Sequence, residues 1–261
     1  MKNPIINHWG AVVLALAFLS TTQGQPIQKP ANTNTNGAKA KTQAGAAAIS
    51  NPVEKDLRVQ ANGKAWRLDK ATISDATLPR VLLVGDSILN GYQGGVVKLL
   101  KGKANVDAWV NPYCQSEKFN SLLAEVLANG PYDVVHINLG LHGWQPGRIP
   151  QGQFEPLTKA FVGIIRQKCP KAMIIWASTT PIMLKGKPEL DPELNPIILE
   201  HNRMAAKVMA EEKVTVSDFY SLMADNLELA RGDQFHWNAA GSKILGEAAT
   251  KAITAALGEK H

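Results

Sequence analysis

Three side chains in this sequence have the types and the spacing that nucleophilic acyl transfer requires. Ser87 ends the short motif Gly85-Asp86-Ser87, and Asp233 precedes His236 by three residues in the segment Asp-Gln-Phe-His. A serine hydroxyl is a weak nucleophile until a base takes its proton, and the base needs a partner that fixes its tautomer and orientation. In a turn with this spacing, the Asp233 carboxylate can bond one nitrogen of the His236 ring while the other faces a cleft. The pattern therefore predicts a serine nucleophile, a histidine base and an orienting aspartate.

Each of these two motifs also has a simpler structural interpretation. A serine that follows a strand is often the N-cap of the next helix, so Ser87 alone could be a cap. Asp233 alone could form a turn that caps the last helix. The two motifs together favour the catalytic interpretation, because both are expected at the carboxyl edge of one sheet, where ligands bind in open α/β folds.

The other histidines are weaker candidates for the base. His8 lies in the apolar amino-terminal segment, and His261 ends the chain. His201 lies within a predicted helix beside Glu200 and Arg203, where a solvated surface role is favoured. His136 lies in the middle of a predicted strand, where a core histidine with satisfied hydrogen bonds is favoured.

Apolar strands alternate with helical stretches over most of the chain, and this alternation must position the motifs. The segment before Gly85-Asp86-Ser87, Val-Leu-Leu-Val, is an uninterrupted aliphatic run typical of a strand covered on both faces. Strict alternation implies right-handed crossovers and a mostly parallel sheet. We predict an α/β protein with one flavodoxin-like, three-layer domain of about five mostly parallel strands and helices on both faces. The expected strands are residues 80–85, 106–110, 132–140, 172–178 and 214–218, and the expected helices are residues 91–102, 116–130, 154–170, 196–212 and 241–258.

From about residue 80 to residue 257, the chain resembles the SGNH or GDSL hydrolase family. The motif at 85–87 matches the family block that carries the nucleophilic serine, and the segment at 233–236 matches the block that carries the acid and the base. The resemblance implies that Ser87 attacks an ester, that His236 moves the proton and that Asp233 orients His236. It implies neither a metal nor an organic cofactor.

The middle blocks of the family pattern differ in this sequence, and they concern the oxyanion hole. The family usually offers a glycine after the second strand and an asparagine after the third, whereas residues 111–119 contain no glycine. Aligning Gly140 with the third-block glycine places His142 at the asparagine position. A neutral imidazole N–H can donate to an oxyanion, so His142 is the first choice and Asn138 the second. The alternative for His142 is a loop histidine that makes a structural hydrogen bond. Asp86 of the first motif is a further candidate for the oxyanion and substrate residues.

The loop after the third predicted strand is expected to border the cleft. Trp144 could stack on the face of a sugar, and Arg148 could pair with a carboxylate or sulfate. The alternative is a loop fixed by proline, with Arg148 bound to backbone carbonyls. The two interpretations are equally favoured.

The amino-terminal segment predicts export. Lys2, the apolar run at 9–20 and the small or polar residues after it are typical of a signal peptide, which we place at residues 1–24. The alternative is an uncleaved anchor. Residues 25–56 have almost no large apolar side chains and are interpreted as a disordered spacer, followed by the hydrolase-like domain at 57–261. The expected localisation is secreted or periplasmic, with no integral membrane domain after cleavage.

Charge and cysteine content restrict the partners further. The chain carries a formal net charge of +6, but no basic run is interleaved with aromatic residues, so no nucleic-acid partner is expected. Cys114 follows one predicted parallel strand and Cys169 precedes another, which places them about 17 Å apart and predicts two unbridged thiols. No cysteine and histidine cluster has metal-ligand spacing, so no metal site is predicted.

These features together predict an exported serine ester hydrolase that removes acetyl or other small acyl groups from carbohydrate. The carbohydrate preference is implied by the family resemblance, and the expected partner is a small-molecule or polysaccharide ester. A glycan O-acyltransferase would use the same three residues and stays open. So does a glycan-binding protein with a lapsed active site, because the middle blocks are altered.

Overall fold

The computed structural model describes residues 67–259, which all belong to one of two compact units of the chain, residues 47–261. The predicted signal peptide at 1–24, the predicted spacer at 25–56 and the predicted domain start at 57 lie outside the described residues. No helix within the described part of the chain is long and apolar enough to cross a membrane.

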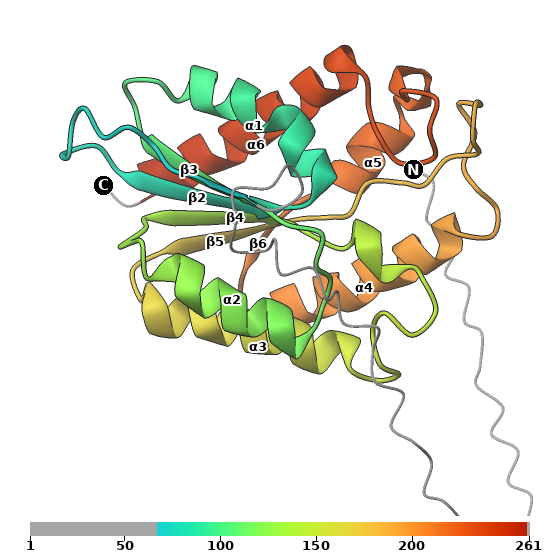
Figure 1. The fold of residues 1–261 in the computed structure, drawn as a ribbon, viewed down its shortest axis with the longest axis horizontal. Coiled ribbons are helices and arrows are strands. Elements are labelled where there is room, and N and C mark those ends of the chain that lie inside the picture. Colours follow the sequence, from blue (N-terminus) through green and yellow to red (C-terminus); the bar gives the residue numbers. More distant parts are fainter. Residues whose placement is uncertain (1–66, 260–261) are drawn as a thin grey trace, which may run out of the picture. The chain divides into compact units, whose positions relative to one another are not determined.

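A six-stranded, mostly parallel sheet forms the centre of the domain, as the alternating pattern predicts (Figure 1). The strand order is β1-β3-β2-β4-β5-β6, and only β1 pairs antiparallel, with β3. The strand bounds are β1 Arg67–Asp69, β2 Arg80–Gly85, β3 Asn105–Val110, β4 Val134–Asn138, β5 Met173–Ala177 and β6 Thr215–Ser217. The strand missing from the sequence prediction is β1, whose three residues are too short and too polar to give an apolar signal.

Helices cover both faces of the sheet, which gives the predicted three layers (Figure 1). On one face, α1 packs against α6 and α6 contacts α5; on the other, α2 packs against α3 and α3 against α4. The bounds are α1 Ser87–Leu99, α2 Glu117–Leu127, α3 Phe154–Lys168, α4 Asn195–Glu211, α5 Phe219–Ala224 and α6 Ala239–Gly258, with short 3-10 helices η2 Leu141–Gly143 and η3 Leu227–Leu229.

The parallel strands end at the same level, and this alignment gathers the loops that follow them. Gly85 of β2 is in register with Val110 of β3 on one side and with Asn138 of β4 on the other. Asn138 is in turn in register with Ala177 of β5. The segments after β2, β3, β4 and β5 therefore meet at one edge, where α/β folds bind ligands.

The first two helices begin at side-chain caps. The predicted cap Ser116 is confirmed, since its hydroxyl accepts a hydrogen bond from Phe119 N at the start of α2. The first helix begins four residues earlier than the glycine-rich segment suggested, because Asp86 caps it by accepting from Ile88 N at 2.9 Å. Asp86 rather than Ser87 is thus the N-cap of α1, which leaves the Ser87 hydroxyl available.

The two cysteines are not joined by a disulfide. Both are buried, and Cys114 Sγ lies 3.8 Å from the carbonyl oxygen of Arg148. Cys169 caps the carboxyl end of α3 at the opposite end of the sheet from Cys114.

Candidate active site

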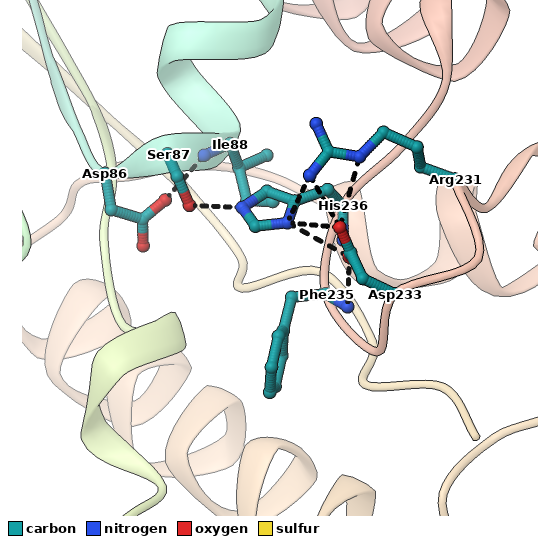
Figure 2. Close-up of polar contacts among 7 residues, drawn as sticks. All are labelled: Asp86, Ser87, Ile88, Arg231, Asp233, Phe235 and His236. Carbon is teal, nitrogen blue, oxygen red and sulfur yellow. Dashed lines mark hydrogen bonds and ion pairs between the residues drawn. The ribbon is translucent and has the colours of Figure 1, made fainter. Parts of the chain in front are cut away.

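Ser87 is the first residue of α1 and lies directly beyond the carboxyl end of β2. Its Oγ is 2.9 Å from Nε2 of His236, a residue 149 positions later in the chain (Figure 2). The other ring nitrogen of His236, Nδ1, is 3.0 Å from both carboxylate oxygens of Asp233. Three side chains that the sequence places in two distant motifs therefore form one continuous hydrogen-bonded series.

The loop that carries Asp233 and His236 is held in shape by the same carboxylate. Asp233 Oδ1 accepts from the backbone N–H groups of Phe235 at 3.0 Å and of His236 at 2.7 Å (Figure 2). Asp233 thus forms the turn that its sequence suggested, but it does not cap the last helix. Asn238 caps α6, by accepting from Ala240 N and Gly241 N.

Arg231 is a site residue that the sequence reasoning missed. Its guanidinium donates to Asp233 Oδ2, from Nη2 at 2.6 Å and Nε at 3.1 Å, and Nη2 lies 3.2 Å from His236 Nδ1. Burial raises the pKa of the Asp233 carboxyl, but hydrogen bonds from Arg231, from the N–H groups of His236 and Phe235 and from the His236 ring lower it well below its usual range overall. Asp233 is therefore ionised wherever the protein is folded near neutral pH.

Asp86 lies next to Ser87 and is almost fully buried, with 1% of its surface exposed. Burial raises the pKa of its carboxyl, while His142, the N–H of Ile88, His236 and the N–H of Leu141 act in the opposite direction without reversing the shift. The carboxyl group therefore lies between the His236 loop and η2. Its observed contact is structural, because it accepts the capping hydrogen bond that starts α1.

The two sequence candidates for oxyanion stabilisation differ in their surroundings. His142 lies in η2, is partly exposed and is close enough to Asp86 to act on its carboxyl electrostatically. Asn138 ends β4 and is buried, and its Nδ2 donates to Ser178 O at 3.2 Å. The Asn138 amide therefore joins the ends of β4 and β5, whereas His142 lies on a loop close to Asp86 of the Gly85-Asp86-Ser87 motif.

Gly140 sets the direction of the loop that carries His142. Its φ of 139° is in the region that L side chains rarely adopt, and a Cβ there would lie 2.4 Å from Thr179 Oγ1. The glycine is thus required both by backbone conformation and by close packing.

Asn111, like Arg231, lies at the carboxyl edge of the sheet and was not singled out by the sequence reasoning. It follows β3, its N–H donates to Gly85 O at 2.8 Å, and its Oδ1 accepts from Tyr113 N. Its Nδ2 is buried and has no hydrogen-bond partner in the part of the chain that the structure describes. The only sequence signal was an asparagine at a strand end, in the block where a glycine was expected.

The structure gives Trp144 and Arg148 intramolecular contacts. Trp144 stacks on Phe235, with ring centroids 6.1 Å apart, and so joins the η2 loop to the His236 loop. Arg148 donates to the carbonyl oxygen of Pro112 at 3.3 Å, which is the backbone-bound alternative considered for it. The cavity beside Ser87, about 130 Å³, is lined by Arg231 and Trp237 instead, together with Asn90, Gly91, His236 and Ser242.

For two of the remaining histidines, the structure differs from what the sequence predicted. His201 is not a solvated surface residue: it stacks on Phe154 with centroids 4.7 Å apart, and burial lowers its pKa. His136 is a core residue as expected, with none of its surface exposed, but neither ring nitrogen hydrogen-bonds to another described residue. Within residues 67–259, no three His, Cys, Asp or Glu side chains are grouped so as to hold a metal ion.

Three solved structures with the same fold are described as ester hydrolases. An acetyl xylan esterase aligns with a TM-score of 0.56 and 18% identity, over 67% of this chain and 99% of that one. A lipase/acylhydrolase from Enterococcus faecalis aligns with a TM-score of 0.56 and 21% identity, over 68% and 96%. A carbohydrate acetylesterase from Sinorhizobium meliloti aligns with a TM-score of 0.55 and 16% identity, over 68% and 99%. At these identities the likeness concerns the fold.

Comparison with curated proteins gave no match. The profile of the GDSL-like lipase/acylhydrolase family, in contrast, matches residues 83–244, more than half of the 261-residue chain. The matched range begins in β2, just before Ser87, and ends in α6, after His236. The chain therefore belongs to the GDSL-like lipase/acylhydrolase family and is an ester hydrolase.

Proposed function

We propose that this protein is an exported serine esterase that removes acetyl or other small acyl groups from carbohydrate. The observation that carries the proposal is the hydrogen-bonded series from Ser87 Oγ through the His236 ring to the Asp233 carboxylate. This is the arrangement that makes a serine hydroxyl nucleophilic near neutral pH.

The reaction would proceed in two acyl transfers. His236 Nε2 accepts the Ser87 proton as Oγ attacks the ester carbonyl, and it returns that proton to the leaving sugar oxygen when the tetrahedral intermediate collapses. Water then loses a proton to His236 and attacks the acyl-enzyme, which releases acetate and regenerates Ser87. Asp233 stays ionised throughout and holds Nδ1–H of His236, so Nε2 is kept free as the base.

Oxyanion stabilisation is assigned to groups around the start of α1. The backbone N–H of Ser87 is at the first position of the helix, where N–H groups have no partner within the helix and the helix dipole favours negative charge. The His142 ring supplies the second donor in this proposal. It is preferred to Asn138, whose amide is engaged with Ser178 O.

The carbohydrate preference rests on similarity and on the size of the cavity. The similar solved structures include an acetyl xylan esterase and a carbohydrate acetylesterase. The cavity of about 130 Å³ beside Ser87 is large enough for a short acyl group. Export, and hence a secreted or periplasmic location, rests on the apolar amino-terminal run of the sequence.

The first experiment tests Ser87 against the capping role. Wild type, Ser87→Ala and the control Ser116→Ala are incubated with p-nitrophenyl acetate and with a fluorophosphonate probe. We expect wild type and Ser116→Ala to hydrolyse the ester and to be labelled, and Ser87→Ala to do neither. Equal behaviour of all three proteins without labelling would overturn the esterase proposal and favour a glycan-binding protein.

Two further arms complete the test. A His142→Ala variant is expected to lose on the order of a hundredfold in kcat if the ring donates to the oxyanion. Acetate release from an acetylated xylo-oligosaccharide, with and without an unacetylated acceptor, separates hydrolysis from transfer. Loss of free acetate in favour of an acetylated acceptor would identify an O-acyltransferase.

A further inference from the structure

The cavity beside Ser87 continues into a larger one along the outer side of α1 and the start of α6. The larger cavity has a volume of about 610 Å³. Gly91, Arg231, Trp237 and Ser242 line both cavities, so the two adjoin. A volume of this size lies in the range of small-molecule sites and exceeds what an acetyl group needs. We name the larger cavity the α1–α6 groove.

The α1 side of the groove has no side chain at two of its lining positions. Gly91 and Gly95 line the groove, and Gly94 is adjacent to them, in a helix of 13 residues. Each interior glycine costs a helix about 1 kcal/mol relative to alanine. A Cβ on Gly94 or Gly95 would meet nothing within 4 Å, so neighbouring side chains do not require either glycine. The glycine at position 95 keeps open a surface that the fold itself does not need.

Apolar groups complete this surface. Leu99 lines the groove with 43% of its surface exposed, which is high for a leucine. Trp237 and Ala239 line it from the α6 side. A partly apolar surface of this kind suits the C–H face of a pyranose ring, as sugar binding to aromatic and aliphatic side chains generally does.

The charged side chains of the groove are mostly cations. Arg231, Lys98 and Lys243 line it, together with one carboxylate, Glu247, which is 3.6 Å from Lys243. Lys98 has no ion-pair partner among the side chains that the structure describes. Arg231 gives Nε and Nη2 to Asp233, and its remaining nitrogen, Nη1, points away from that carboxylate (Figure 2). Among the described residues, the groove therefore offers two cationic donors that the fold has not already engaged, Lys98 Nζ and Arg231 Nη1.

Resting on the proposed function, we infer that the α1–α6 groove binds an acidic sugar residue of the substrate, next to the residue whose ester Ser87 attacks. The substrate class is then an O-acetylated polysaccharide that contains uronic acid. Its carboxylates would contact Arg231, Lys98 and Lys243, and its ring faces would lie on the glycine side of α1. The groove adjoins the Ser87 cavity, so both contacts can be made by one chain of sugars.

The test compares Gly95→Leu with the matched control Gly94→Leu. Both variants add the same side chain to the same helix in open space, but only position 95 lines the groove. The quantity measured is the ratio of kcat/KM for O-acetylated oligogalacturonate to kcat/KM for p-nitrophenyl acetate. We expect this ratio to fall at least fivefold in Gly95→Leu and to stay within twofold of wild type in Gly94→Leu.

A second comparison tests the charge. In Lys98→Gln/Lys243→Gln, kcat/KM for O-acetylated oligogalacturonate is expected to fall three- to tenfold, mainly through KM, and the loss should shrink at high salt. The same variant should change kcat/KM for acetylated xylo-oligosaccharide less than twofold. Equal losses on the acidic and neutral glycans would overturn the assignment of an acidic sugar.

The outcomes separate this inference from the proposed function. If wild type hydrolyses p-nitrophenyl acetate through Ser87 and Gly95→Leu leaves the ratio unchanged, the esterase stands and the groove inference fails. If wild type neither hydrolyses the ester nor reacts with the fluorophosphonate, the proposed function fails first. A drop in the ratio for Gly94→Leu equal to that for Gly95→Leu would show a helix effect, and it would also overturn the groove inference.

Discussion

The two faces of the sheet are packed in different ways. On the face covered by α2, α3 and α4, aromatic rings form a continuous series: Trp109 stacks on Phe119 at 5.4 Å, Phe119 meets Phe161 edge-on at 5.7 Å, and Phe161 stacks on Trp176 at 5.6 Å. All four rings are buried. Such rings contribute large buried apolar areas in addition to favourable ring geometry.

The face covered by α1, α5 and α6 includes polar groups and glycines. His136 and the Tyr92 hydroxyl are buried there without hydrogen-bond partners among the described residues. Asp86 is buried beside them, since its charge contributes to the raised pKa of Tyr92 after burial itself. The helix on this face, α1, also carries the glycines that leave the groove open.

Because of this difference, residues that mainly stabilise the fold and residues that mainly serve the reaction lie on different faces of the sheet. Buried polar groups without partners cost free energy. Single atoms of this kind also occur on α2 and α3, Asn120 Oδ1 and Thr158 Oγ1, but a whole ring without a partner among the described residues, that of His136, lies on the face that also carries Ser87 and the groove. The face covered by α2, α3 and α4, called the aromatic face below, carries neither Ser87 nor the groove, so its packing can be optimised for stability. Each of the following substitutions should therefore affect mainly one of the two properties, according to the face on which it lies.

The largest effect is expected from Asp233→Asn, at the catalytic edge. The asparagine oxygen can still accept from Phe235 N and His236 N, so the turn is kept, but the ionised partner of His236 Nδ1 is lost. We expect kcat for p-nitrophenyl acetate to fall about 10⁴-fold, as loss of the correct tautomer does in such sites. Asp75→Asn, in an exposed turn, is the control. A loss of less than tenfold would show that Asp233 does not orient the base.

On the aromatic face, Phe119→Ala is expected to reduce stability without affecting the chemistry. Phe119 is fully buried between Trp109 and Phe161, so its removal should lower the free energy of unfolding by about 3–5 kcal/mol. Denaturant unfolding measures this loss, and kcat under conditions where the variant is folded should match wild type. A drop in kcat of the folded variant would mean that the two faces are coupled.

The third prediction concerns the pH dependence of stability and His136. Burial lowers the pKa of His136 from 6.5 to about 4, so between these values the unfolded chain binds a proton that the folded protein does not. The stabilising contribution is therefore complete above about pH 6.5 and is lost as the pH falls towards 4. The total loss in the free energy of unfolding from this titration is ~3 kcal/mol.

His136→Phe removes this titration and keeps a ring against Tyr92 and Phe219. The measurement is the free energy of unfolding of both proteins from pH 7 to pH 4.5, so that carboxylates common to the two cancel. We expect wild type to lose more stability than the variant over this range. Parallel curves would mean that His136 is paired in solution and does not titrate differently on unfolding.

Much of this architecture follows from short-range sequence signals. The aliphatic run before Ser87, the cap Ser116 and the alternation of strands and helices are local patterns, and the fold they predict is present. The spacing of Asp233 and His236 predicted their contact because a single turn closes it. What these signals share is that neighbouring residues determine the outcome.

Other features depend on contacts between distant segments, which local patterns do not encode. Arg231 is two residues from Asp233, yet nothing in the sequence showed that it would also border the Ser87 cavity. The sequence left open whether Trp144 faces a sugar or has a structural role, and it did not show that a ring 91 positions later, Phe235, would stack on it. Arg148 likewise has a backbone carbonyl within reach only after folding.

The direction of the edge strand β1 has a consequence for how this domain can be attached to a surface. Because β1 runs antiparallel, its first residue, Arg67, is level with Val110 at the carboxyl edge, and the Arg67 side chain reaches Asn90 beside the Ser87 cavity. The last helix runs away from that edge for 20 residues, about 30 Å, and ends at Gly258 (Figure 1). If the domain were attached to a solid surface directly before Arg67, that surface would face the cleft and restrict access by a long polymer. Attachment after Gly258 would leave the catalytic edge turned outward.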